Sequence, residues 1–220
     1  MPPDDRRLLF LTGADGVGKT SLASRLEERL RRSGRPVERA WVRYQNYTSK
    51  PLLALARLAG LSYYEQHDGC RFGYHDFYKS RLMAGVFVLL QAIDVNIASY
   101  CKIVRRMNPN GILLCDRGPY DTLFDVMIDT GYYNLGRTLW ERIYTRTVRR
   151  RCRVLLIDRE YYSILRSRPA LIHDRHLRTK LELLRAYAGA FRWPIICNDG
   201  TLEQAVDQIE TQLGLQTGAL

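Results

Sequence analysis

One lysine beside a glycine-rich turn is the feature of this sequence with the clearest chemistry. Residues 13–20 read GADGVGKT and fit the pattern G-x-x-x-x-G-K-[ST] in full, with an apolar run before them and a helical pattern after them. Glycines let a turn present its backbone N–H groups to phosphate oxygens, and the helix adds the positive end of its dipole. We therefore predict a nucleotide triphosphate site formed by Gly13, Asp15, Gly16, Val17, Gly18, Lys19, Thr20 and Ser21.

Two residues of this turn have separate expected roles. Lys19 is expected to reach the β- and γ-phosphates, and Thr20 is expected to place its hydroxyl on Mg²⁺. The alternative is a glycine turn that enters a helix by accident, which typical residue frequencies allow in roughly one chain of this length in a hundred.

A second charged motif ends another apolar run. Residues 111–121 read GILLCDRGPYD, which places Asp116 and Arg117 at the carboxyl end of a predicted buried strand. Ligands of open parallel sheets bind at such ends. Asp116 is expected to hold Mg²⁺ directly or through water, and Arg117 is expected to bridge the two anions that meet in phosphoryl transfer. The alternative is a charged pair that caps a strand at the surface.

The elements that must position these residues alternate along the chain. Helical patterns separate short apolar runs, which predict strands over residues 7–13, 36–44, 111–117, 153–159 and 194–199. Residues 62–75 show no clear period and are expected to form a loop, and residues 76–107 are expected to form one long helix. The pattern predicts a single α/β domain over residues 1–220, with a parallel sheet covered by helices on both faces.

The two motifs together carry a resemblance. TGADGVGKTSLASRL, followed about a hundred residues later by LLCDR, resembles the thymidylate-kinase family of P-loop nucleotide kinases. The resemblance is specific at the two motifs and weak in the sequence between them. It implies a three-layer fold with a five-stranded parallel sheet in the order 2-3-1-4-5, ATP and Mg²⁺ as cofactors, and a lid at about residues 159–175.

The resemblance also implies acceptor-binding residues. Asp15 would contact a sugar hydroxyl of the acceptor, Arg43 would grip its phosphate, and Arg117 would bridge donor and acceptor. Phe77 and Arg81, four apart on the expected helix, would stack on the acceptor base and touch its edge or phosphate. Asp15 is equally suited to forming the turn, and Phe77 and Arg81 are equally suited to packing and to the surface.

The predicted lid is rich in arginine. It contains Arg159, Arg166, Arg168 and Arg175, and by the resemblance such a lid closes over ATP and supplies transition-state arginines; we favour Arg166 and Arg168. The sequence departs from the family after Asp116-Arg117, where GPYDTLFD places Tyr120, Asp121, Thr122 and Asp125 near the acceptor. Acceptor specificity therefore stays open.

Three functions remain to be separated. The leading one is an ATP-dependent kinase of a nucleoside monophosphate such as dTMP, whose ionised phosphate needs no general base. The alternative is a kinase of a hydroxyl on a nucleoside, a nucleic acid or another metabolite, in which Asp116 or Asp121 would accept the proton. A non-catalytic nucleotide-binding switch is a second alternative, but the N-K-x-D motif of switch GTPases is absent from the sequence.

Composition bears on partners and compartment. The net charge of +11 is carried almost entirely by arginine, which suits a nucleotide or nucleic acid partner or, alternatively, reflects a high-GC genome. Five cysteines without zinc spacing, and an N-terminus without the form of a signal peptide, are typical of a cytoplasmic protein. The apolar run LMAGVFVLLQAI is shorter than the ~20 residues of a membrane span and is expected to lie in the core or to form a homodimer surface.

Overall fold

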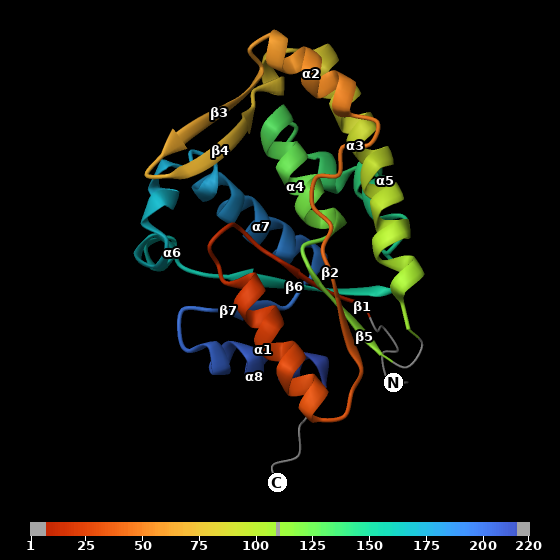
Figure 1. Ribbon diagram of the computed structural model, residues 1–220, viewed down its shortest axis with the longest axis vertical. Helices are drawn as coiled ribbons and strands as arrows, with labels where there is room; N and C mark the ends of the chain where they lie inside the picture. The colour runs from red at the N-terminus through yellow and green to blue at the C-terminus, as the bar shows by residue number, and fades with distance from the viewer. Residues whose placement is uncertain (1–7, 109–110, 215–220) are drawn as a thin grey trace.

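A parallel sheet forms the centre of the protein (Figure 1). The structure, a computed structural model, describes residues 8–108 and 111–214. Within these residues the sheet has five strands, which lie in the order β2-β5-β1-β6-β7 and are all parallel. Their bounds are β1 Leu8–Thr12, β2 Val37–Ala40, β5 Ile112–Asp116, β6 Cys152–Asp158 and β7 Ile195–Cys197. The central strand β1 is buried at every position, because helices cover both faces of the sheet.

The helices divide between the two faces of the sheet (Figure 1). On one face lie α1 (Lys19–Arg32) and α8 (Leu202–Leu213), which pack side by side. The other face carries α3 (Arg81–Lys102), α4 (Pro119–Thr130), α5 (Leu139–Thr145) and α7 (Leu177–Phe191). Every residue of α4 is buried, so α4 is the innermost helix of this layer. The predicted α/β class, with a parallel sheet flanked by helices, is confirmed.

A β-hairpin replaces the loop expected at residues 62–75. Strands β3 (Ser62–His67) and β4 (Cys70–His75) pair antiparallel, and Figure 1 shows them projecting toward α6 (Tyr161–Ser167). The turn residues Asp68 and Gly69 both have positive φ, 48° and 74°. An Asp-Gly pair between two short runs is a strong hairpin signal even where the runs themselves show no clear period.

The long helix predicted at residues 76–107 is interrupted near its start. Phe77–Lys79 form the 3₁₀ helix η1, Ser80 is extended, and α3 begins only at Arg81. The Ser80 hydroxyl accepts a hydrogen bond from the Met83 N–H, which caps α3. Phe77 and Arg81 therefore do not share a helix face, and that prediction is wrong.

Other predicted elements are shorter than expected. Strand β2 ends at Ala40, so Arg43 lies in the connection that follows it. The remaining elements are α2 (Lys50–Leu58), η2 (Val104–Arg106) and η3 (Leu135–Arg137). In the predicted lid, α6 is followed by η4 (Pro169–His173).

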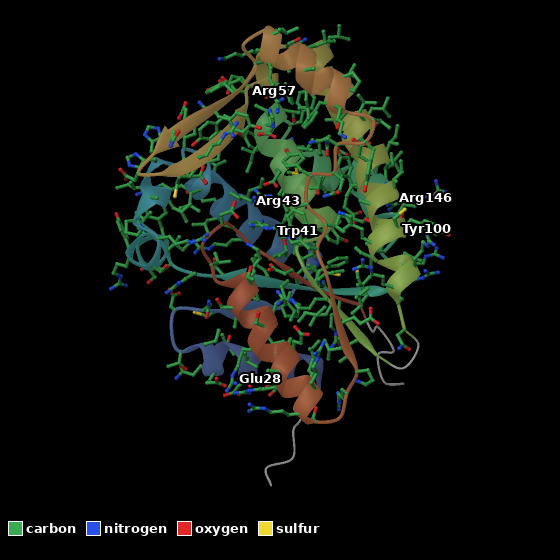
Figure 2. The ribbon with its side chains drawn as sticks, viewed as in Figure 1. Glu28, Trp41, Arg43, Arg57, Tyr100 and Arg146 are labelled. Atoms are coloured by element: carbon green, nitrogen blue, oxygen red, sulfur yellow. The ribbon has the colours of Figure 1, made fainter. Side chains whose placement is uncertain are left out.

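One face of α3 is left uncovered. Its exposed apolar residues are Leu82, Leu89, Ile93, Ile97 and Tyr100; Figure 2 shows Tyr100 on the outer side of the molecule. The segment Arg81–Arg106 is long and apolar enough to cross a bilayer by length and composition, contrary to the expectation from the shorter run. Half of its apolar window is buried in the protein, as in the core helix of a globular domain.

Candidate functional site

The glycine-rich loop lies at the carboxyl end of the central strand. It connects β1 to α1, and its backbone has φ of +85° at Gly16 and +93° at Gly18. A Cβ at Gly16 would lie 2.6 Å from a methyl of Leu171 and 2.7 Å from a methyl of Ile164. Glycine is therefore required at this position for both conformation and space. The predicted lid packs directly on the loop.

Lys19 is buried beneath this loop. Its Nζ donates hydrogen bonds to the carbonyl oxygens of Gly13 at 2.7 Å and Ala14 at 2.6 Å. Burial, assisted by the charge of Arg117, lowers the pKa of Lys19 to about 7. Polyphosphate oxygens would offer this ammonium a partner of full charge in place of neutral carbonyls.

Thr20 and Asp116 meet at the place predicted for the metal. The Thr20 hydroxyl donates to Asp116 Oδ2 at 2.5 Å, and Asp116 Oδ1 is buried without a hydrogen-bond partner in the described chain. Hydroxyl and carboxylate oxygens are suitable ligands for Mg²⁺, which usually keeps several waters and phosphate oxygens as well. No group of three or more His, Cys, Asp or Glu side chains able to hold a metal occurs among the described residues. These residues therefore fit a magnesium ion bound together with nucleotide phosphates, rather than a metal enclosed by protein.

A cavity of about 310 Å³ opens over the glycine-rich loop and Thr20, and we call it the phosphate cavity; Asp116, which Thr20 contacts, is not among its lining residues. It is lined by Asp15, Gly16, Gly18, Lys19, Thr20, Ser21, Arg117, Arg159, Ser167 and Arg168. Val17 is buried beneath it, where its carbonyl oxygen accepts a hydrogen bond from the Asn198 side chain at 2.7 Å. All of the predicted loop residues except Gly13 and Val17 therefore line the phosphate cavity.

The lid arginines separate into two groups. Arg168 and Arg159 line the phosphate cavity, whereas Arg166 does not. Arg166 is exposed, and its guanidinium donates to the Ser163 hydroxyl at 3.1 Å on its own helix. The expectation for Arg166 is therefore corrected in favour of Arg159, because α6 turns Arg166 away from the cavity.

Arg117 occupies a strained backbone conformation. Its φ of +97° lies in the left-handed region, where a residue with a side chain is disfavoured by roughly 1–3 kcal/mol. The guanidinium forms an ion pair with Asp15, and its Nη1 is buried without a hydrogen-bond partner in the described chain. Asp121 Oδ1 lies 4.0 Å from this nitrogen, beyond hydrogen-bond distance, so a phosphate oxygen could supply the missing hydrogen bond.

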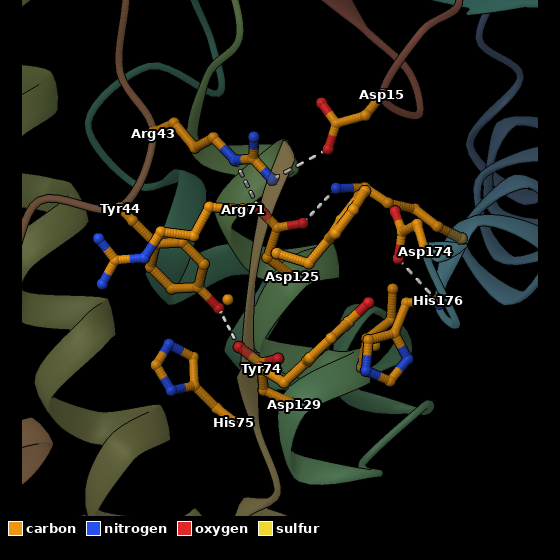
Figure 3. Close-up of a pocket in the computed structure, with 14 residues that line it drawn as sticks. Asp15, Arg43, Tyr44, Arg71, Tyr74, His75, Asp125, Asp129, Asp174 and His176 are labelled. Carbon is orange, nitrogen blue, oxygen red and sulfur yellow. Dashed lines mark hydrogen bonds and ion pairs between the residues drawn. The ribbon is translucent and has the colours of Figure 1, made fainter. Parts of the chain in front are cut away.

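A neighbouring cavity of about 320 Å³ adjoins the phosphate cavity, and we call it the acceptor cavity (Figure 3). Its walls come from the hairpin, α4, the connection after β2 and the start of α7. Of the described residues, only Asp15 lines both cavities. A group transferred from one cavity to the other would pass Asp15.

Ion pairs form one end of the acceptor cavity. Arg43 lies between two carboxylates, with Nε 3.1 Å from Asp125 and Nη2 3.2 Å from Asp15 (Figure 3). Lys180 forms a further ion pair with Asp125. Burial raises the pKa of Asp15, but Lys180, Arg43 and Arg117 outweigh this and hold it well below its usual range. Asp15 is therefore ionised at neutral pH.

Uncharged polar groups form the other end of the cavity. The Tyr44 hydroxyl donates to Asp129, and burial raises the pKa of Asp129 to about 8. Burial also lowers the pKa of His75 to about 4 and lowers that of His176. His75 Nδ1 and His176 Nε2 are buried without hydrogen-bond partners among the residues described.

Five residues predicted to bind the acceptor lie outside this cavity, and one of them, Arg117, lines the phosphate cavity instead. Phe77 is fully buried in the core, where its ring centroid lies 4.4 Å from that of Phe87, so it offers no face for stacking on a base. Arg81 is exposed at the first turn of α3. Tyr120 and Asp121 also lie outside the cavity, so the prediction that they bind the acceptor is corrected as well.

Both of the latter residues serve the packing of α4. The buried Tyr120 hydroxyl donates to Glu141 at 3.2 Å, and its ring packs edge-on against Trp193. Asp121 caps α4 by accepting from the Gly118 N–H at 2.8 Å, and it also accepts from the Thr12 hydroxyl at 3.1 Å.

Most residues of the acceptor cavity are not predicted by the sequence. Lys180, Asp129, His75 and His176 come from three separate elements and match no motif. One signal is present: Asp125 and Asp129 are four apart within a run that is otherwise largely apolar, so they lie on one face of a buried helix.

Comparison with known proteins leaves the family open. No protein-family model matches this chain, and no curated protein is significantly similar to it.

Proposed function

We propose that this protein is an ATP- and Mg²⁺-dependent phosphotransferase that resembles thymidylate kinase and transfers the γ-phosphate to an acceptor bound in the acceptor cavity. The observation that carries the proposal is the junction of two cavities at Asp15, one lined by the glycine-rich loop and cations and the other by hydrogen-bonding groups. A binding switch needs only the first cavity.

The sheet supports assignment to the P-loop kinases. Counted among themselves along the chain, its strands lie in the order 2-3-1-4-5, and the loop leaves the central one. The loop pattern, the strand-end Asp116-Arg117 pair and the strand order are three separate features that the resemblance requires together.

Each lining residue has a task in such a transfer. Lys19 binds the β- and γ-phosphates and accompanies the charge that develops on them, while Arg117, Arg159 and Arg168 neutralise the transferring group from other sides. Thr20 and Asp116 would hold Mg²⁺, which when bound neutralises phosphate charge. The segment containing Ile164 and Leu171 covers the loop and excludes water that would compete as acceptor.

The acceptor implied by the resemblance is a nucleoside monophosphate such as dTMP. By the resemblance Arg43 would meet its phosphate; Arg43 lies at the end of the acceptor cavity nearest Asp15, where it is paired with Asp15 and Asp125. Phe77 cannot stack on this acceptor, because its side chain is enclosed in the core. Arg81 cannot contact the acceptor, because its side chain lies on the surface.

The test is nucleotide binding followed by turnover. Calorimetry with ATP and Mg²⁺ is expected to give a saturable signal, and Lys19→Ala is expected to lower turnover by ~10²-fold or more, as for loss of a main electrostatic contact. Arg166→Ala, which alters an exposed arginine of the lid outside the cavity, is the matched control and should retain turnover. Absence of binding by any purine triphosphate with Mg²⁺ would refute the proposal.

A further inference from the structure

Two cations of the acceptor cavity, Arg43 and Lys180, are already paired with carboxylates of its own wall. Arg43 is shared by Asp125 and Asp15, and Lys180 is paired with Asp125. The exposed Arg71, also on the cavity wall, lies with its guanidinium 3.6 Å from the ring centroid of Tyr64. A phosphate dianion entering this cavity would have to displace carboxylates that already hold the buried cations.

The deeper part of the cavity adds carboxyl groups instead of cations. Asp129 and Asp174 both line it, and Asp174 accepts a hydrogen bond from the His176 N–H at 3.0 Å. Burial raises the pKa of each carboxyl group. Carboxyl oxygens repel phosphate when ionised, and they accept or donate hydrogen bonds to hydroxyl groups in either state.

Two histidines of the cavity wall each carry a ring nitrogen whose hydrogen bond is not supplied by the residues described. His75 Nδ1 and His176 Nε2 are buried, line the cavity through their residues, and have no partner among the residues described. Buried polar atoms in folded proteins are nearly always hydrogen-bonded, so a ligand or water is expected to supply these bonds. Figure 3 shows both rings at the end of the cavity away from Asp15.

Aromatic rings complete the wall. Tyr44, Phe72 and Tyr74 line the cavity beside the two histidines. Rings of this kind, with a few hydrogen-bonding groups between them, suit a flat or ring-shaped molecule that carries hydroxyl groups.

We propose that the acceptor is an uncharged, hydroxyl-bearing ring compound of the nucleoside or sugar class, and that its attacking hydroxyl is oriented by Asp15. This inference rests on the proposed function and specifies its substrate class. A nucleoside and a free sugar share the relevant chemistry, and they are distinguished by which of them the purified protein phosphorylates.

The step conserves atoms and charge. The acceptor oxygen forms a bond to the γ-phosphorus of ATP, and the bond from that phosphorus to the β,γ-bridging oxygen breaks, with its electron pair leaving on ADP. The hydroxyl proton passes to the Asp15 carboxylate, which releases it to solvent after the product leaves. Asp15 lies between the two cavities and is ionised at neutral pH; because neighbouring cations lower its pKa, it is a weak base that orients the hydroxyl and takes the proton only as the new bond forms.

The substrate class is tested with purified wild-type protein, ATP and Mg²⁺. Nucleosides, pentoses and hexoses, and nucleoside monophosphates are compared by ADP release and by mass spectrometry of the product. We expect phosphorylation of members of one of the two neutral classes and no diphosphate formation. Diphosphate formation would overturn this inference and leave the proposed function intact. If ATP binds but no neutral acceptor reacts or raises the melting temperature at millimolar concentration, the inference is also overturned.

Variants locate the effect in the acceptor cavity. His75→Phe and His176→Phe retain a ring and remove the nitrogens, so each is expected to raise the acceptor KM about three- to tenfold, with ATP affinity unchanged. Gln66→Ala, an exposed position on the same hairpin, is the matched control. Asp15→Asn is expected to lower kcat with the neutral acceptor by ~10²-fold or more while ATP still binds. An unchanged acceptor KM in both histidine variants, or an unchanged kcat in Asp15→Asn, would contradict the proposal.

Discussion

At the scale of single residues, burial alters the charges of the site more than sequence suggests. Lys19 and Asp129 are ordinary ionisable residues in the printed sequence, yet burial brings the pKa of Lys19 to about 7 and that of Asp129 to about 8. Each shift has a measurable consequence. The shift of Lys19 is expected to appear when a ligand binds, and the shift of Asp129 is expected to appear in the stability of the free protein.

Nucleotide binding is predicted to take up a proton at Lys19. At pH 8 the lysine with a pKa of about 7 is mostly neutral in the free protein, and contact with phosphates restores its charge. Calorimetric titration of ATP in two buffers with different ionisation enthalpies should therefore give different heats at pH 8, corresponding to uptake approaching one proton per site. The difference should shrink at pH 6, where Lys19 is already charged. Equal heats in both buffers at pH 8 would contradict this prediction.

Asp129 is predicted to lower the stability of the free protein as pH rises from about 4 to about 8, while His75, with its lowered pKa, contributes the opposite dependence between about 4 and 6.5. Over the wider window folded Asp129 keeps a proton that the unfolded chain, with the ordinary pKa of 3.8, has released. Asp129→Asn keeps the shape without the charge, so it should remove the contribution of Asp129 and raise the free energy of unfolding at pH 8 relative to wild type. Urea unfolding at pH 5, 6.5 and 8 measures the effect. The exposed Glu182→Gln is the control, and a wild-type slope in Asp129→Asn would rule out this role.

At the scale of elements, the hairpin holds the lid. The His173 Nε2 lies 3.0 Å from Asp68 Oδ2 at the hairpin turn, and its ring stacks on that of His67 with centroids 4.6 Å apart. The Tyr74 hydroxyl donates to the His173 carbonyl at 3.2 Å. Because the lid also packs on Gly16, the hairpin joins the acceptor cavity to the cover of the phosphate cavity.

Loss of this contact is predicted to loosen the lid. His173→Ala removes the ring stacking and the contact with Asp68, each a partly exposed interaction worth up to ~1 kcal/mol. Amide hydrogen exchange over residues 159–175 is expected to become about two- to fivefold faster, with little change in the sheet. Ile172→Ala, at an exposed neighbouring position, is the matched control. Identical exchange in His173→Ala and the control would show that the hairpin does not restrain the lid.

At the scale of the whole molecule, the densest basic run of the sequence lies away from the candidate site. Residues 146–153, RTVRRRCR, precede or begin β6, whereas both cavities lie at the carboxyl ends of the parallel strands. Figure 2 shows Arg146 on the outer side of the molecule and Arg43 near the centre of the view. A nucleic acid held by this basic segment would lie near the amino end of β6, whereas both cavities lie at the carboxyl ends of the strands.

Binding to nucleic acid and catalysis are therefore predicted to be separable. Changing the exposed Arg150 and Arg151 together to glutamate should weaken binding to duplex DNA and reduce its salt dependence by about one to two in the slope of log K against log salt. Turnover of a small acceptor should stay within about twofold of wild type. Fluorescence anisotropy across salt concentrations, beside the ADP-release assay, measures both; equal loss of binding and turnover would contradict the separation.

Pairing of two copies through the exposed face of α3 also stays a prediction, to be measured by light scattering.

Sequence alone determined the features that depend on local pattern or on a rigid motif. Alternating apolar runs and helical periods predicted the parallel sheet and its helical cover, because buried strands and amphipathic helices have different periods. The residues of the glycine-rich loop were found because phosphate binding requires glycine and lysine at fixed spacing along one turn. Asp116 and Arg117 were found because the carboxyl end of a strand is itself readable from sequence.

Tertiary structure decided which side chains face the acceptor. Phe77 and Arg81 were expected there and lie elsewhere, since an extended Ser80 separates the 3₁₀ turn from α3. His75, Asp129 and Lys180 come together from a hairpin and two helices, and no spacing along the chain encodes that meeting. The glycine-rich loop is local, so the phosphate binding proposed for it can be predicted from consecutive residues; the acceptor cavity is formed by long-range packing, so its lining exists only once the chain has folded.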